Sequence, residues 1–159
     1  MRMKNDAHLL DTDTTSNFLD RRRGSARLRE TIGAAAPDTI FISIVTFDET
    51  LRGVQNLLNQ ARKHPRNAEK IVGYYGFLYE LAYDLRRFQI LPYDANAEAQ
   101  FQQIPANVRQ QHSQDCHIAA VALANDLTVV TSNTRHFAKI PGLLYEDWAK
   151  EATPDAPIL

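Results

Sequence analysis

Short apolar segments alternate with helical patterns along the chain, and this alternation limits the possible folds more than any other feature of the sequence. The apolar segments are rich in aliphatic, β-branched or aromatic residues, as buried strands usually are. They comprise residues 7–10, 39–44, 89–93 and 127–131, and a terminal edge strand is expected within 135–148. Strands separated by helices predict a parallel sheet that is covered on both faces. We therefore expect an α/β fold: a three-layer α/β/α sandwich around a mostly parallel sheet of about five strands.

The two central helical patterns predict a protruding helical hairpin. From Thr46, apolar residues recur every three or four positions, which defines one stripe of an amphipathic helix. This stripe consists of Phe47, Leu51, Val54, Leu58 and Ala61, and the matching face of the second helix consists of Ile71, Tyr75, Leu78, Ala82, Leu85 and Phe88. The surplus of tyrosines in the second helix is consistent with a partner surface and equally with core packing. Further helices are expected at residues 13–20, 25–35, 95–111 and 113–124, with a short one after residue 134.

Length and composition favour one ordinary globular domain. The chain has 159 residues, from which we expect a single domain over residues 1–150 and a loose tail over residues 151–159. It contains no apolar run near the roughly 18 residues of a membrane span and no charged-then-apolar leader, so we expect a cytoplasmic protein. The single cysteine, Cys116, agrees with a reducing compartment. A net charge of −1 argues against a passive nucleic-acid binder, so any attraction to nucleic acid would need local charge or a bound metal.

Two acids follow the first strand. Asp11 and Asp13 stand at the end of an apolar run, where the sheet edge meets the next helix. In open α/β sheets, ligands bind in the crevice beyond the carboxyl ends of the strands. The alternative is that one of three residues, Asp11, Asp13 or Thr14, merely caps the helix.

Two further acids begin later helices. Glu49 is expected in the first turn after the second strand, with Asp48 as its rival and a helix-dipole role as the alternative. Asp115 begins a helix that is apolar almost all round, and the nearby His117 is either a ligand or base, or a helix-surface residue. If Asp11, Glu49 and Asp115 meet at one edge, their oxygens suit Mg²⁺ or Mn²⁺, because like charges this close need a cation. The sequence shows neither zinc-spaced Cys/His residues nor a glycine-rich phosphate loop.

The first motif, taken alone, resembles that of a phosphatase family. Leu-Leu-Asp11-Thr-Asp13-Thr-Thr is similar to the opening motif of haloacid-dehalogenase-like phosphatases, with residues 41–46 as a second motif. That family also needs an acid pair after a late strand to hold Mg²⁺. Here the late strand is followed by Thr131-Ser132-Asn133, which contains no acid.

The chain contains four motifs in order: Leu-Leu-Asp11-Thr-Asp13, Ile-Ser-Ile-Val-Thr-Phe-Asp-Glu49, Gln-Asp115-Cys-His-Ile-Ala-Ala-Val-Ala-Leu-Ala-Asn and Leu-Thr-Val-Val-Thr-Ser-Asn133-Thr-Arg-His-Phe. Together they resemble the PIN-domain ribonucleases, in particular the VapC-type toxins of bacterial toxin-antitoxin pairs. The resemblance runs from His8 to Trp148, and the closing segment Ile-Pro-Gly-Leu-Leu-Tyr-Glu-Asp-Trp148 is similar too. It implies an Mg²⁺- or Mn²⁺-dependent endoribonuclease that acts on RNA, forms a homodimer and is bound by a cognate antitoxin protein. A catalytically reduced PIN module that only binds RNA or protein is the alternative.

The resemblance also implies roles for individual residues. Asp11, Glu49 and Asp115 would hold the metal, and the family's fourth acidic position is occupied by Asn133, which cannot supply charge. Asp13 stands where the family often has Asn and would add negative charge. Their places beside the acids suggest that three further residues contact phosphate: Thr12, Ser132 and Arg135.

Overall fold

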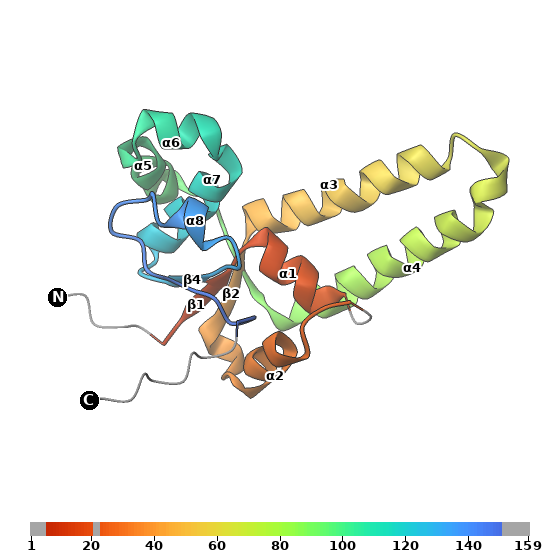
Figure 1. Ribbon diagram of the computed structural model, residues 1–159, viewed down its shortest axis with the longest axis horizontal. Helices are drawn as coiled ribbons and strands as arrows, with labels where there is room; N and C mark the ends of the chain where they lie inside the picture. The colour runs from red at the N-terminus through yellow and green to blue at the C-terminus, as the bar shows by residue number, and fades with distance from the viewer. Residues whose placement is uncertain (1–5, 21–22, 151–159) are drawn as a thin grey trace, which may run out of the picture.

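A five-stranded parallel sheet forms the centre of the molecule. The computed structural model describes residues 6–20 and 23–150, and its strands follow the order β3-β2-β1-β4-β5 (Figure 1). The strands are β1 (His8–Leu10), β2 (Ile40–Ser43), β3 (Gln89–Leu91), β4 (Thr128–Val130) and β5 (Tyr145–Glu146). All neighbouring strands pair in parallel, so their carboxyl ends lie at one edge of the sheet. The predicted parallel sheet is confirmed, as is the edge position of the terminal strand.

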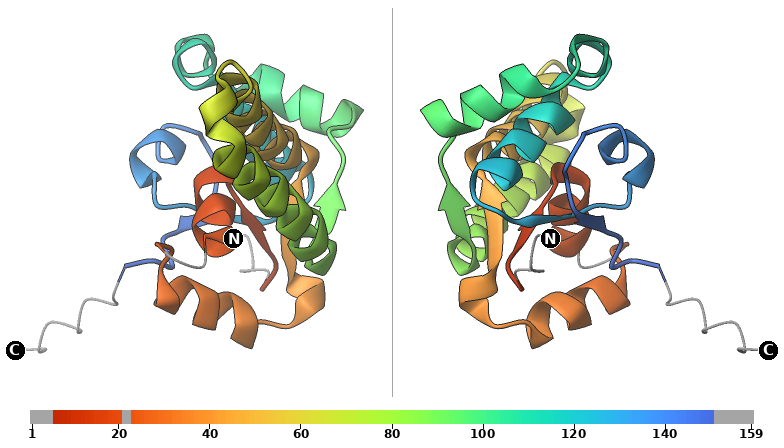
Figure 2. Two further views of the ribbon diagram at one scale, coloured as in Figure 1. Left: turned by 90° about the vertical axis from the view of Figure 1, so that its right-hand side faces the viewer. Right: turned by 90° about the vertical axis from the view of Figure 1, so that its left-hand side faces the viewer.

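Helices cover both faces of this sheet. They are α1 (Thr12–Leu19), α2 (Ala26–Ala34), α3 (Ile44–Ala61), α4 (Ala68–Asp84), α5 (Ala95–Gln103), α6 (Ala106–Gln111), α7 (Ser113–Ala124) and α8 (Thr134–Phe137). Successive side chains of a strand point to opposite faces, and Leu9 and Leu10 accordingly belong to two separate buried clusters. Leu9 packs with residues of α5 to α8, whereas Leu10 packs with residues of α1 to α4. Figure 2 shows α2 and α5 on opposite sides of the sheet, which confirms the three layers.

The hairpin formed by α3 and α4 extends away from the body of the molecule (Figure 1). Three predicted positions of the α3 stripe, Val54, Leu58 and Ala61, are buried. The predicted face of α4 is partly wrong, because Tyr75 and Ala82 are exposed. The inward face instead contains Ile71, Tyr74, Phe77, Leu78 and Leu81. The main helix that α4 contacts is α3, and the tyrosines on its opposite face are exposed to solvent.

Two predicted helix boundaries are also wrong, and each has a local cause. The third helix begins at Ile44 and not at Thr46, since the Ser43 hydroxyl accepts a hydrogen bond of 3.1 Å from the Thr46 N–H and caps the helix. The single helix expected over residues 95–111 is divided into α5 and α6. Pro105 lies at the break, where it has no N–H to donate and disfavours a helical conformation at the preceding residue.

Within the described residues, none of the helices has the length and apolar character needed to cross a membrane. The tail predicted over residues 151–159 lies outside the part of the chain that the structure describes.

Candidate functional site

Asp11 directly follows the central strand and is 2% exposed. Its Oδ1 atom accepts a hydrogen bond of 2.8 Å from the Thr14 N–H, so Asp11 is the N-cap of α1. Of the three residues considered as caps, Asp11 and not Asp13 or Thr14 has this role, and Asp13 lies exposed in the first turn of the helix. Capping uses one carboxylate oxygen of Asp11, and the residue remains at the carboxyl edge of the sheet.

Burial raises the pKa of Asp11 above its ordinary value, and the nearby charge of Asp13 raises it further. Hydrogen bonds from Thr131 and Thr14 act in the opposite direction without cancelling the effect of burial. Thr131 follows the neighbouring strand β4 and is fully buried. Sequence reasoning did not assign Thr131 a role, although its place after a strand beside β1 was a usable signal.

Glu49 lies in the second turn of α3, because that helix begins two residues earlier than predicted. Burial raises its pKa, and the negative charges of Asp115, Asp13 and Asp11 raise it further, while a hydrogen bond from Thr12 lowers it. These contributions indicate that Asp11, Asp13, Glu49 and Asp115 lie near one another, and we call this group the acidic pocket. Among the described residues, no hydrogen-bond donor reaches the buried Oε1 atom of Glu49.

Asp48, the rival of Glu49, points away from this pocket. Its exposed carboxylate forms an ion pair of 3.0 Å with Arg52, one turn further along α3. Of the two neighbouring acids, only Glu49 is part of the acidic cluster.

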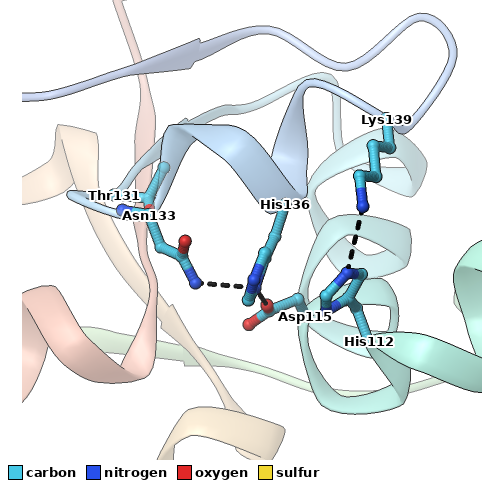
Figure 3. Close-up of polar contacts among 6 residues, drawn as sticks. All are labelled: His112, Asp115, Thr131, Asn133, His136 and Lys139. Atoms are coloured by element: carbon cyan, nitrogen blue, oxygen red, sulfur yellow. Dashed lines mark hydrogen bonds and ion pairs between the residues drawn. The ribbon is translucent and has the colours of Figure 1, made fainter.

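Asp115 lies in the first turn of α7 and joins the pocket to α8. Its Oδ2 atom is 2.7 Å from Nδ1 of His136, and the same ring nitrogen is 2.6 Å from Nδ2 of Asn133 (Figure 3). The Asn133 N–H in turn donates to the hydroxyl of Thr131 over 2.8 Å. Asn133 is thus linked to both Asp115 and Asp11 through one intermediate side chain each.

A second histidine completes the polar surroundings of Asp115. The ring of His112, the residue before α7, stacks on that of His136 with 3.7 Å between centroids. Its Nε2 atom is 3.4 Å from the Lys139 ammonium (Figure 3). Sequence reasoning missed both histidines. The signals were the three-residue spacings from His112 to Asp115 and from Asn133 to His136.

The remaining residues that the sequence suggested for the site differ in their contacts with the acids. Thr12 contacts Glu49, as described above. Ser132 and Arg135 are exposed, and within the described residues neither forms a hydrogen bond or ion pair with the acids. His117 behaves as a helix residue: its ring stacks on Phe101 and its Nδ1 atom is 2.6 Å from the Ser113 carbonyl.

The pocket combines four carboxylates, and among the described residues only Asp115 has an ion-pair partner, His136 at 2.7 Å. Within the described part of the chain, no Lys or Arg side chain forms an ion pair with Asp11, Asp13 or Glu49. A divalent cation bound by carboxylate oxygens would relieve both the repulsion and the unpartnered oxygen of Glu49. The residues present therefore fit a hard divalent cation such as Mg²⁺ or Mn²⁺.

The fold and the site together define a parallel α/β domain with an acidic cluster at the carboxyl edge of its sheet. The chain belongs to the PIN domain family, whose model matches residues 8–143. This match favours the PIN-domain resemblance over the phosphatase alternative.

Comparison with individual proteins identifies relatives over nearly the full length. The tRNA(fMet)-specific endonuclease VapC of Shigella flexneri is 29% identical over 145 residues, which cover 89% of this chain and 97% of that protein. Ribonuclease VapC2 of Rickettsia felis is 27% identical over 120 residues, which cover 73% of this chain and 79% of that protein.

Solved structures share the fold. FitAcB from Neisseria gonorrhoeae matches with a TM-score of 0.68 and 26% identity, covering 89% of this chain and 98% of that one. DNA-bound VapBC from Salmonella typhimurium matches with a TM-score of 0.60 and 27% identity, covering 92% of this chain and 99% of that one.

Proposed function

We propose that this protein is an Mg²⁺- or Mn²⁺-dependent endoribonuclease that hydrolyses RNA phosphodiester bonds as the toxin of a toxin-antitoxin pair. The observation that carries the proposal is the acidic pocket, in which burial and three neighbouring carboxylates raise the pKa of Glu49 and no described residue donates a hydrogen bond to its Oε1 atom. The similar VapC proteins, named as a tRNA(fMet)-specific endonuclease and a ribonuclease, support RNA as the substrate.

The proposed ligands come from three different elements. Asp11 follows β1, Glu49 lies on α3 and Asp115 on α7, so residues far apart in the sequence would supply the ligands. Asp13 adds negative charge at the rim of the pocket. When bound, the cation would lower the pKa of a water molecule and neutralise charge on the phosphate.

The side chains around the cation would orient water and substrate. Asp11 and Asp115 hold the cation, while Glu49, on the opposite helix, accepts a proton from the attacking water or orients it. The amide of Asn133 is polar and uncharged, so it can donate to a phosphate oxygen without repelling it. The hydroxyls of Thr12 and Ser132 and the guanidinium of Arg135 are the proposed further phosphate contacts.

We further propose that the protein works in the cytoplasm, forms a homodimer and is inhibited by a cognate antitoxin. The solved VapBC assembly that it resembles at 27% identity supports a protein partner. A protein partner could bind the exposed apolar side chains of α4, which are Val72, Tyr75, Tyr79 and Tyr83.

RNA cleavage measured during an Mn²⁺ titration tests the proposal. The wild-type protein should cleave RNA only with the metal present, and Asp11→Asn should lose this cleavage at least about 100-fold, as expected when a metal ligand is removed. Metal-independent or absent cleavage by the wild-type protein would favour the alternative, a PIN module that only binds RNA or protein.

A further inference from the structure

Two imidazoles and one carboxylate meet beside the acidic pocket. His112 precedes α7, Asp115 lies in its first turn, and His136 comes from α8. One ligand atom from each residue lies within 4.8 Å of the others, and all three residues are half-buried. Ligand-type side chains from two separate parts of the chain therefore lie close together (Figure 3).

The donor set differs in kind from that of the acidic pocket. Carboxylate oxygens suit Mg²⁺ and Mn²⁺, whereas imidazole nitrogens favour Zn²⁺, Co²⁺ and similar transition metals. Two His and one carboxylate leave a fourth tetrahedral position for water. Ligands about 2.0–2.1 Å from zinc are about 3.4 Å apart. Small side-chain rotations would bring atoms now within 4.8 Å to that separation.

The two polar contacts of His136 Nδ1 cannot both be hydrogen bonds. His136 Nδ1 contacts the Asp115 carboxylate, an acceptor, and the Asn133 amide nitrogen, a donor. One ring nitrogen cannot donate to the first and accept from the second. The Lys139 ammonium can only donate, so its contact with His112 Nε2 requires a lone pair on that nitrogen. A nitrogen that faces an ammonium group in this way is also suited to a metal cation.

We propose that His112, Asp115 and His136 form a binding site for a nitrogen-preferring divalent transition-metal ion of the Zn²⁺ or Co²⁺ type. The site is separate in ligand chemistry from the carboxylate pocket but shares Asp115 with it. Its occupation would engage the carboxylate that the proposed nuclease needs. Zn²⁺ should accordingly lower the rate of Mg²⁺-dependent RNA cleavage, a consequence that rests on the proposed function.

Cobalt provides a direct optical test of the binding site. Metal-stripped full-length protein without a histidine tag is titrated with Co²⁺ and followed by its visible d–d absorption, and Zn²⁺ binding is measured by calorimetry. We expect one equivalent of Co²⁺ per chain with a tetrahedral spectrum. His112→Gln and His136→Gln should each weaken binding at least tenfold, since even loss of an outer-shell partner costs about 10–100-fold.

His64→Ala is the matched control, because His64 is exposed at the turn of the hairpin, far from this cluster along the chain. It should bind Co²⁺ as the wild-type protein does. Circular dichroism of each variant verifies that it is folded. If the wild-type protein does not bind stoichiometric Co²⁺, or if folded His112→Gln and His136→Gln variants bind it unchanged, the proposal is overturned.

Asp11→Asn separates this proposal from the proposed nuclease function. Asp11 belongs to the carboxylate pocket and not to the histidine cluster, so this variant should keep the Co²⁺ spectrum while losing RNA cleavage. If Asp11→Asn loses Co²⁺ while the histidine variants retain it, the metal occupies the carboxylate pocket and the histidine site is rejected. If the histidine variants alone lose Co²⁺ and the wild-type protein shows no Mg²⁺-dependent RNA cleavage, the histidine site stands and the proposed nuclease function fails.

Discussion

Thr12 on α1 donates a hydrogen bond to Glu49 on α3 and thereby lowers the pKa of a carboxyl that burial and three neighbouring acids raise. The hydroxyls of Thr12 and Thr46 lie 3.5 Å apart, which places Thr12 against the start of α3. The contact joins the segment after β1 to the segment after β2. It favours the ionised form of Glu49, which is the form that a metal site or a general base requires.

Replacing Thr12 by Val should move the acidic limb of the cleavage pH profile to higher pH. The hydrogen bond lowers the pKa of Glu49, so its loss raises that pKa, and the carboxylate then forms only at higher pH. The measurement is the pH dependence of kcat/KM. Thr31→Val is the control, since its hydroxyl donates to Arg27 on the distant α2. An unchanged midpoint in Thr12→Val would show that Thr12 does not tune Glu49.

The metal-free protein should lose stability as the pH rises through the raised pKa values of Asp11 and Glu49. Their ordinary values are 3.8 and 4.5, and both are higher in the folded state. Between the ordinary and the raised values, the folded chain binds more protons than the unfolded chain, so the free energy of unfolding falls with increasing pH. Urea denaturation in EDTA at a series of pH values measures this slope.

Asp11→Asn should make the free energy of unfolding of the metal-free protein less dependent on pH. It should keep the helix cap, because Asn caps helices about as well as Asp. At neutral pH the metal-free variant should be at least as stable as the wild-type protein. Asp48→Asn, which changes an exposed carboxylate, should leave the slope as it is. Equal slopes for the wild-type protein and Asp11→Asn would contradict the raised pKa of Asp11.

Gly24→Ala and Gly33→Ala should change stability in opposite directions. A Cβ atom on Gly24 would lie 2.0 Å from the Asn17 carbonyl and 2.5 Å from that of Asp20, so the backbone must shift. We expect a loss of about 1–3 kcal/mol. Gly33 lies within α2, and a Cβ there meets nothing within 4 Å. Alanine should therefore stabilise the helix by about 0.5–1 kcal/mol. Thermal unfolding measures the stability of both variants. A loss of stability in both Gly24→Ala and Gly33→Ala would contradict this prediction.

The sequence predicted the sheet and the principal acids because both depend on local patterns. Apolar segments such as residues 39–44 can be buried only as strands between helices, and parallel pairing then brings their carboxyl ends together. Asp11 and Glu49 follow neighbouring strands, so their proximity follows from the order of the elements. Because α3 begins two residues earlier than predicted, Glu49 lies in its second turn and not in its first, but it still belongs to the acidic pocket.

The histidine cluster was not predictable in the same way. The contact between His136 and Asp115 joins α8 to α7 and depends on how a short helix of four residues packs. No periodicity specifies that packing. The outward position of Tyr75 and Ala82 was missed for a similar reason, since it depends on how far α4 extends beyond the sheet.

Calorimetric titration with Mg²⁺ at neutral pH tests the central claim most directly, because Mg²⁺ prefers the oxygen ligands of the carboxylate pocket to imidazole nitrogens. We predict that the wild-type protein binds Mg²⁺ and is stabilised by about 2.7 kcal/mol at a concentration of 100 times its Kd. Asp11→Asn and Glu49→Gln should each weaken binding at least about tenfold, whereas Asp48→Asn should bind as the wild-type protein does. Binding that is equally strong in Asp11→Asn, Glu49→Gln and the wild-type protein would contradict the claim that these carboxylates form a metal site.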